Sequence, residues 1–600
     1  MLATLVLLAQ TSSAGAASTP RAAVERALPQ LEESAKVFVA NRSCVSCHHN
    51  ALPILTFRLA ASRGLKIDRA ILASVERKTF RELTDVRALD EAVQGVSVSD
   101  PTPNDSWLLI AAQTAGLAPD LTNGVYAKRI ASWQHDGHWT TSDFRPPHSS
   151  SVFTATATAV RAIRAYFPDE MRAAEDAALA AARHWLLETP PASTEDATFR
   201  LLGLVWAGAG RDDVATATRD LLKRQKAGGG WPQLSDGYPQ DAYSTGEALY
   251  ALHEAGTPAS SAAWRKGVAF LLATQAADGT WRVRTRMISP ANVSPPYFTT
   301  GFPYKKDEYL SYAASCWATM ALLSDMPATR AAPPPPPVAE RPPVDPAGVM
   351  RTALFGTAAQ LSSSIPPDFN ANLATPNGTT LLMAAVPDVD KVTYLISRGA
   401  DAVARSQAGY DAATTAATYR GSAPAIRALL DAGADAEPPE NVKVRRSPLL
   451  LASMSGDAET VSLLLARGAS ANPRPNPSGD SPISEAITFG HAAIVRTLIQ
   501  AGAKTSLVER TGVNLLHWAT ITNRADVVPE LAKAGVDINA LDEKGFTPLM
   551  YAATIDFGET ATLNMLLSAG ADRTIRNEAG RTPLQQARHF GHEQLARALR

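Results

Sequence analysis

The sequence predicts an all-α protein with two helical parts, and three observations support this expectation. Apolar residues recur at helical spacing through the first half of the chain, and no convincing run of alternating polar and apolar residues indicates strands there. In the same half, a Gln-x-x-x-Gly-x-Trp pattern separates successive helical stretches. In the second half, a unit of 33 to 35 residues repeats. We therefore expect an all-helical first half made of successive packed helices, followed by a solenoid of stacked repeats.

Composition limits the classes of partner. The chain has 600 residues, of which 45% are hydrophobic and 19% are charged, so two or more domains with substantial cores are expected. Its formal net charge is −1 and no basic run stands out, which gives no electrostatic support for nucleic acid or an acidic membrane surface as a partner. The only long apolar run is at the N-terminus, so we expect no transmembrane span after the leader is cleaved.

The N-terminus is typical of a signal peptide. Residues 1–9 are apolar apart from Thr4, and Ala14-x-Ala16 fits a signal-peptidase site, although the usual charged segment is missing. We therefore expect residues 1–17 to be a signal peptide. The mature protein is then periplasmic or secreted.

After the leader, an amphipathic helix is expected over residues 20–41, with a break or kink at Pro29. It leads into the motif Cys44-x-x-Cys47-His48. Two thiols at this spacing can form thioethers to haem vinyl groups, and the adjacent His can ligate the iron. Covalent haem c is the predicted cofactor, with Cys44 and Cys47 as attachment points and His48 as the iron ligand. A disulfide stays open as an alternative, and zinc is a poorer one because these side chains crowd too closely.

A distal haem ligand would have to come from elsewhere in the chain. No Met lies between Met1 and Met171, and His49 is too close to the motif. The remaining candidates are His135, His138 and His148.

Apolar helical stretches then follow one another to about residue 326, with short breaks between them. Two connections are long and rich in Pro and aromatic residues, at 139–151 and 288–307, and such loops in compact helical domains are more often functional than not. The clearest helical stretches are 52–61, 107–115, 153–166, 173–187, 199–207, 245–255, 262–273 and 309–323.

The Gln-x-x-x-Gly-x-Trp pattern predicts a staple between helices. Gly lets the chain reverse sharply, Gln can bond exposed backbone at a neighbouring helix end, and Trp packs over the junction. The complete copy covers residues 266–281 and ends in Asp278-Gly279-Thr280-Trp281. A second copy runs from Gln225 to Trp231, and a copy one residue shorter runs from Gln134 to Trp139.

These motifs resemble the QW motif of the terpenoid cyclase and protein prenyltransferase superfamily, in particular squalene-hopene cyclases. The resemblance implies an α/α toroid over residues 20–326. Cyclases of the hopene type carry Asp-x-Asp-Asp-Thr, whose middle Asp protonates the substrate. Here Asp241 and Thr245 match, but Tyr243 stands where that acid should be, and a phenol is far too weak an acid to protonate an alkene. The zinc-binding His of prenyltransferases would fall at Ser244.

The toroid resemblance also implies a central cavity that could hold an apolar ligand. Asp241, Tyr243 and Asp307 are the candidate catalytic residues, and each has a structural alternative as a helix cap, a core residue or a rim hydrogen-bonding group. Further polar and aromatic candidates for the cavity wall are His148, Glu247, Tyr250 and Trp317.

Residues 327–347 form a Pro-rich linker, which we expect to be semi-rigid. The repeats that follow, over 348–600, resemble ankyrin repeats: about six, with a degenerate cap at each end. Pro of the Thr-Pro-Leu signature suits the first turn of a helix, and Gly of the Gly-Ala-Asp signature ends the second helix. That Gly recurs at Gly399, Gly433, Gly468, Gly502, Gly535 and Gly570.

Two functions follow from these patterns. The first is an exported ankyrin-repeat protein that binds a protein partner on the concave face of its solenoid, with the toroid as a ligand-binding or docking domain that lacks the usual cyclase acid. The alternative is an enzyme, either a redox enzyme bearing haem c or a divergent terpenoid-cyclase-like enzyme. Its substrate would be apolar or polymeric.

Overall fold

The computed structural model of the chain is mostly helical. It describes residues 19–42, 47–96, 101–143, 145–148, 150–234, 237–287, 299–329, 331, 333–339, 348–440, 442, 446–474 and 479–600. Over this described part, one two-stranded antiparallel sheet is formed, in which β1 (Trp231–Pro232) pairs with β2 (Gln240–Asp241). The all-α prediction is therefore confirmed.

In the first half, a set of inner helices closes into a ring. Each inner helix packs against the next one along the chain, and the last packs back against the first. These helices are almost wholly buried, which explains why their sequences are apolar on all sides. In order they are α2 (Leu52–Ser62), α6 (Ser106–Ala115), α8 (Val152–Tyr166), α10 (Thr194–Trp206), α12 (Ala242–Glu254) and α14 (Glu308–Ser324).

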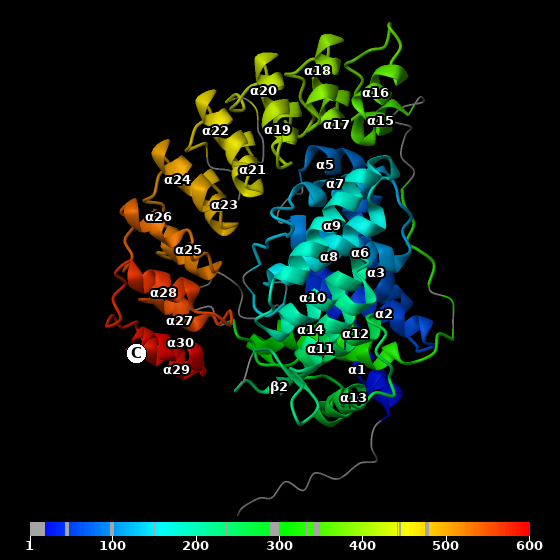
Figure 1. Ribbon diagram of the computed structural model, residues 1–600, viewed down its shortest axis with the longest axis vertical. Helices are drawn as coiled ribbons and strands as arrows, with labels where there is room; N and C mark the ends of the chain where they lie inside the picture. Colours follow the sequence, from blue (N-terminus) through cyan, green and yellow to red (C-terminus); the bar gives the residue numbers. More distant parts are fainter. Residues whose placement is uncertain are drawn as a thin grey trace, which may run out of the picture.

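Outer helices surround this ring, and most of them pack against its inner helices (Figure 1). They are α1 (Pro20–Asn41), α3 (Arg69–Thr79), α4 (Arg81–Thr84), α5 (Ala88–Gln94), α7 (Leu121–Ser132), α9 (Arg172–Glu188), α11 (Arg211–Leu222) and α13 (Ala262–Thr274). Short turns of helix complete this half: η1 (Cys47–Ala51), η2 (Pro101–Asp105), η3 (Asp169–Met171) and η4 (Lys305–Asp307).

Two local expectations need correction. Helix α1 is not broken at Pro29, because its buried face, which includes Leu28 and Leu31, outweighs the lost backbone hydrogen bond. Helix α10 contains the helical stretch expected from Phe199 but begins earlier, at Thr194, because Ser193 and Asp196 form a capping box.

The Gln and Trp staples have the geometry that the sequence predicts. Gln275 donates through Nε2 to the carbonyls of Gly279 and Ala23, 2.8 Å each, which joins the end of α13 to the start of α1. Trp281 is fully buried, and its indole Nε1 donates to Leu271 O at 2.8 Å. The staple therefore closes the outer layer between the last and first helices. Equivalent bonds link Gln225 to Ala263, Gln134 to Ala178, Trp231 to Leu221 and Trp139 to Ile130.

The described part of the linker lies against the ring. Arg58 donates to the carbonyls of Pro333 and Pro334, at 3.0 and 3.2 Å, and Ala339 N donates to Thr84 O at 2.9 Å. The described part of the linker therefore lies alongside α2 and α4. Residues 340–347 lie outside the described residues.

The repeats form pairs of short antiparallel helices. The inner helices stack in chain order and most begin at a Ser, Thr, Asp or Asn cap, as the repeat signature predicts. They are α15 (Val349–Phe355), α17 (Leu381–Ala385), α19 (Ala412–Ala416), α21 (Pro448–Ser455), α23 (Pro482–Thr488), α25 (Leu515–Ile521), α27 (Pro548–Thr554) and α29 (Pro583–Phe590).

The outer helices stack behind the inner ones, on the convex side of the solenoid (Figure 1). They are α16 (Ala358–Ser364), α18 (Val389–Ser397), α20 (Ala423–Asp431), α22 (Ala458–Ala466), α24 (Ala492–Gln500), α26 (Val528–Lys533), α28 (Ala561–Ser568) and α30 (Glu593–Ala598).

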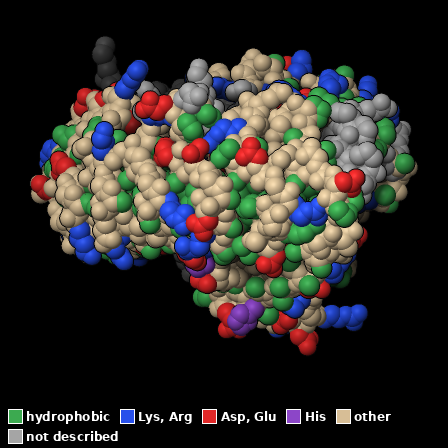
Figure 2. All heavy atoms as spheres, turned by 90° about the horizontal axis from the view of Figure 1, so that it is seen from above, with side chains coloured by type: hydrophobic (Ala, Val, Ile, Leu, Met, Phe, Trp, Pro, Cys, Tyr) green, Lys and Arg blue, Asp and Glu red, His purple; other side chains and the backbone are tan. Residues whose placement is uncertain are grey.

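The solenoid curves around the ring, and its concave side faces the ring (Figure 1). Helix α5 of the ring contacts α17 and α19, and most buried apolar residues of both halves belong to one continuous core. On the face seen in Figure 2, acidic and basic side chains are interspersed, consistent with the formal net charge of −1. The concave surface that the sequence predicts for a protein partner is thus in contact with the chain's own helices.

Candidate functional site

The ring inserts an acidic side chain into a loop of the solenoid. Asp90 of α5 is 7% exposed, and its carboxylate accepts hydrogen bonds from Thr375, Asn377 and Thr379 in the loop that precedes α17. The bonds from Asn377 Nδ2 and Thr379 Oγ1 are 2.7 and 2.5 Å long. These partners are all neutral, so the buried charge of Asp90 is balanced by donated hydrogen bonds.

One turn further along α5, Gln94 continues this contact. Its Nε2 donates to Thr379 Oγ1 at 2.7 Å, and its Oε1 accepts from Ser406 Oγ at 2.9 Å in the next loop of the solenoid. Residues four apart lie on the same face of a helix, which is why Asp90 and Gln94 reach two successive loops. Gln94, Thr379 and Ser406 are all buried.

Helix α7 supplies a second set of anchors. Lys128 is 7% exposed, and its ammonium donates to Leu354 O and Val386 O at 2.9 and 3.0 Å and lies 5.3 Å from the Tyr419 ring centroid. Burial lowers the pKa of Lys128 well below its usual range. The two carbonyl groups and the aromatic ring compensate the burial of this ammonium group.

Trp133, just after α7, extends the interface to later repeats. Its indole Nε1 donates to Thr418 O at 2.9 Å, and its ring lies edge-on to that of Phe489 with the centroids 5.7 Å apart. Trp133 therefore combines an apolar contact with a directional hydrogen bond, as aromatic anchors of protein interfaces commonly do.

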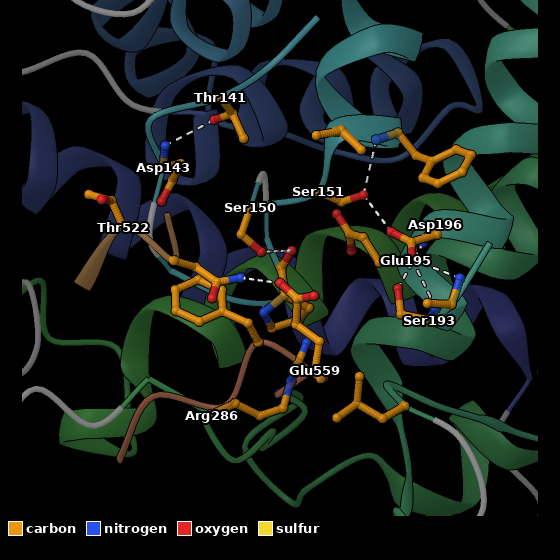
Figure 3. A pocket seen from close by; sticks show the side chains of 18 of the residues that line it. Thr141, Asp143, Ser150, Ser151, Ser193, Glu195, Asp196, Arg286, Thr522 and Glu559 are labelled. Carbon is orange, nitrogen blue, oxygen red and sulfur yellow. Dashed lines mark hydrogen bonds between the residues drawn. The ribbon is translucent and has the colours of Figure 1, made fainter. Parts of the chain in front are cut away.

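Where the later repeats approach the ring, a cavity of about 310 Å³ lies between the two halves. Figure 3 shows Ser193 and Asp196 at the start of α10 on one side and Thr522 of the solenoid on the other. Arg286 holds the halves together beside it, donating through Nη1 to Asp556 O at 2.6 Å, and Arg524 donates to Thr141 O. The cavity exists only because both halves line it.

In the wall of this cavity, Glu195 is the centre of a buried hydrogen-bonded cluster. Thr154 Oγ1 donates to Glu195 Oε1 at 2.7 Å, and Tyr243 OH donates to Glu195 Oε2 at 3.0 Å. His148 Nδ1 lies 3.1 Å from the same hydroxyl and can donate to it as the Nδ1–H tautomer. The cluster is a short relay from an imidazole through a phenol to a carboxyl group that lines the cavity.

A second carboxyl group, that of Glu247, lies next to Glu195. Glu247 is fully buried, and its carboxyl group interacts with that of Glu195 and with the hydroxyl of Tyr243, so the two carboxyl groups can share a proton. Burial, and next the charge of Glu195, raises the pKa of Glu247 well above its usual range, and burial raises the pKa of Glu195 to about 7. Such a pair can hold or give up one proton near neutral pH.

Aromatic side chains pack against one another inside the ring, next to the cluster that contains Glu195 and His148. Trp317 lies 5.4 Å from the Tyr250 ring centroid and 6.4 Å from those of Trp107 and Phe199. Trp107 in turn is stacked on His148 with the centroids 6.2 Å apart. The predicted wall residues His148, Tyr243, Glu247, Tyr250 and Trp317 are thus brought together from three segments of the chain, the loop before α8 and helices α12 and α14.

The other two candidate catalytic residues have structural contacts. Asp241 caps α12, accepting from Ser244 N at 2.9 Å and from Gln233 Nε2 at 2.8 Å, and burial raises its pKa to about 6. Asp307 is 1% exposed and binds Thr285 N and Arg282, at 3.1 and 3.2 Å. None of these four hydrogen-bonding partners belongs to the Glu195 cluster.

Glu195 was missing from the predicted set. It lies in the first turn of α10, where acidic residues are common because they complement the helix dipole, so sequence alone gives it no distinguishing signal.

The predicted haem motif lies largely outside the described residues. Cys44 lies outside the described residues, and the side chains of Cys47 and His48 are not described either. The neighbouring His49 is fully buried between Phe38 and Tyr312, with ring centroids 4.7 and 4.0 Å away, and burial lowers its pKa to about 3. Among the described residues no group of three metal-ligating side chains occurs. None of the described helices is long and apolar enough to cross a membrane.

The Glu195 carboxyl makes stability depend on pH in a testable way. Because burial raises its pKa from 4.5 to about 7, its stabilising contribution is complete below pH 4.5 and is lost as the pH rises through 7. Glu195→Gln cannot ionise, so its unfolding free energy should fall less between pH 5 and pH 8 than that of the parent, by on the order of 2–3 kcal/mol.

Urea denaturation at pH 5, 6, 7 and 8 measures this difference, with Glu188→Gln at the exposed end of α9 as the control. Parallel pH profiles for the parent and Glu195→Gln would show that Glu195 is ionised throughout this range.

Comparison with known proteins identifies the repeats. A family model described as ankyrin repeats in three copies matches residues 415–509 and 502–577. The ankyrin repeat protein YahD of Escherichia coli K12 is 27% identical over 222 residues, which cover 36% of this chain and 92% of that protein. Palmitoyltransferase Hip14 of Drosophila melanogaster is 34% identical over 126 residues, 21% of this chain and 19% of its own.

The ankyrin repeat protein FPV031 of fowlpox virus is 30% identical over 152 residues, 24% of this chain and 45% of its own length. This chain therefore spans less than half of Hip14 and of FPV031. Together with the stacked helix pairs, these matches show that the C-terminal part of the chain consists of ankyrin repeats.

Proposed function

We propose that this chain is an exported ankyrin-repeat protein that mediates protein–protein interaction, and that its N-terminal ring is a terpenoid-cyclase-type toroid docked on the repeats. Ankyrin repeats bind proteins with the surface made by their inner helices and loops. Here that surface holds α5 and α7 of the ring through Asp90, Lys128 and Trp133. This intramolecular contact is the observation that carries the proposal.

The nature of the contact supports a true docking interface. Its anchors are a buried acid, a buried Lys and a Trp, each with specific partners on the solenoid, whereas incidental contacts between domains are mostly exposed and poorly packed. The closed order of inner helices and the three Gln–Trp staples support the toroid assignment.

The docking proposal is tested by cutting the linker. A protease site is inserted between Val344 and Asp345 of the full chain, the chain is cleaved, and the product is run on a sizing column at micromolar concentration. The two halves should elute together, because a buried interface of this kind binds below micromolar concentration without the covalent link. Elution as two separate species would refute docking.

Export and haem attachment belong to the same proposal. The apolar leader over 1–17 and the Cys44-x-x-Cys47-His48 motif support each other, because c-type haem is attached outside the cytoplasm. Expression in a host with c-type maturation should yield a protein whose mass has lost the leader and gained one haem. A colourless mature protein would remove haem c from the proposal.

A second candidate function is acid–base catalysis within the ring on an apolar or polymeric substrate. The buried Glu195–Glu247 pair above the aromatic side chains of Trp107 and Trp317 favours it, since a protonated carboxyl group in a dry site is a competent general acid. Squalene is the first substrate to offer, with product analysis by gas chromatography. Turnover that disappears in Glu195→Gln would make the enzymatic function the leading one.

A further inference from the structure

The loops of the first repeats have the chemistry of a receptor for an acidic helix. The carboxylate of Asp90 enters a pocket made by two hydroxyl groups and one amide, from Thr375, Thr379 and Asn377. The bond from Thr375 N to Thr379 O, at 2.9 Å, and the positive φ of Gly378, +83°, hold the loop backbone in the shape of this pocket. A carboxylate is the group that three convergent neutral donors fit best.

The second position of this receptor is specific for a side chain that both donates and accepts. Gln94 donates to Thr379 and accepts from Ser406, so one amide joins the two loops. A carboxylate here would lack the donor for Thr379, and a Lys would lack the acceptor for Ser406. The receptor thus recognises an acidic side chain followed, one helical turn later, by an amide side chain.

We propose that the loops before α17 and α19 are a binding site for an acidic helix of a partner protein, with Asp or Glu at one position and Gln or Asn four residues later. Helix α5 occupies this site within the chain, so the partner competes with α5 and releases the first repeats from the ring. The inference rests on the proposed docking function, and it names the chemistry of the competing partner.

Competition within one chain has a quantitative consequence. A helix tethered to its receptor acts at an effective concentration of about 1 mM or more, so a free helix of equal affinity binds the parent protein poorly. Replacing Asp90 and Gln94 with Ala removes the two side chains of α5 that occupy the site and leaves the receptor loops unchanged. We call this variant the vacated protein. The same free helix should then bind much more tightly.

The test uses a fluorescein-labelled peptide with the sequence of residues 81–96 and the full-length protein. Fluorescence anisotropy should show that the peptide binds the double variant Asp90→Ala/Gln94→Ala at least tenfold more tightly than the parent. A peptide with Asn in place of Asp90 should bind the double variant at least tenfold more weakly than the parent peptide. Circular dichroism confirms that the variant has kept its helical content.

Receptor variants give an independent measurement. Adding Thr375→Val and Thr379→Val to the vacated protein removes two donors while keeping the side-chain shape, and peptide binding should fall at least tenfold. Thr497→Val, on the exposed side of α24, is the matched control and should leave it unchanged. Equal binding of the Asp and Asn peptides, or no gain on vacating the site, overturns the inference.

The two proposals can fail separately. If the halves of the cleaved parent chain elute together but the peptide does not bind the vacated site, docking stands and the acidic-helix receptor is wrong. If the halves separate, the docking function itself is wrong.

Discussion

Gly279→Ala is expected to lower the apparent free energy of unfolding of the ring by about 3 kcal/mol or more. Gly279 has φ of +87°, and a Cβ there would overlap the backbone carbonyl of Arg26. An L-residue at positive φ already costs about 1 kcal/mol, and overlap with backbone that cannot move adds to that cost. The change also disturbs the turn in which Gln275 donates to Gly279 O, and with it the bond from Gln275 to Ala23 O that closes the outer layer of the ring.

Gly256→Ala is the matched control for this variant. Gly256 also has positive φ, +76°, but a Cβ there would meet nothing within 4 Å, so the change should cost only about 1 kcal/mol. Urea denaturation followed by circular dichroism compares the two. Equal losses would mean that strain in the backbone, and not the close approach to Arg26, is what Gly279 relieves.

Lys128→Glu is expected to separate the ring from the repeats in the cleaved chain. The new carboxylate would face the carbonyl oxygens of Leu354 and Val386, which now accept from the ammonium group, in a nearly dry interface. Truncating or reversing one partner of a buried charged contact costs about 3–5 kcal/mol, so binding of the two halves should weaken by roughly 200-fold or more.

The measurement is the concentration at which the cleaved halves elute separately. Lys223→Glu, in which the side chain is 75% exposed on the outer surface of the ring, is the control and should behave like the parent. If Lys128→Glu halves still elute together at micromolar concentration, Lys128 is not an anchor, and the interface is held by Asp90 and Trp133.

The local architecture was accessible from the sequence because it depends on short-range physics. Helical spacing of apolar residues predicted the six inner helices and the outer helices α1, α9 and α13, although a capping box starts α10 earlier than expected. The outer helices α3, α4, α5, α7 and α11 were not predicted, and α5 and α7 are the helices that contact the repeats. The Gln-x-x-x-Gly-x-Trp pattern predicted staples, since Gln, Gly and Trp each have a role that a turn between two helices requires. The repeat period likewise predicted the solenoid, because each unit needs its neighbours to bury its apolar face.

The candidate site was only partly accessible. His148, Tyr243 and Glu247 were singled out as polar residues among apolar helices, and they do lie together. Asp241 and Asp307 were singled out in the same way but serve as a helix cap and a partner of Arg282. Sequence spacing cannot separate these roles, because a carboxylate at a helix start looks the same whether or not it faces a second carboxyl group.

The sequence by itself determined that the first half is all-helical and that the second contains ankyrin repeats, since both follow from periodicity and turn chemistry within stretches of about 40 residues or fewer. Only the tertiary structure decided what the concave surface binds. The bonds from Thr375, Asn377 and Thr379 to Asp90 join residues 285 to 289 positions apart. A charge buried among neutral donors leaves no periodic trace in sequence, because its partners are selected by the folded surface that surrounds them.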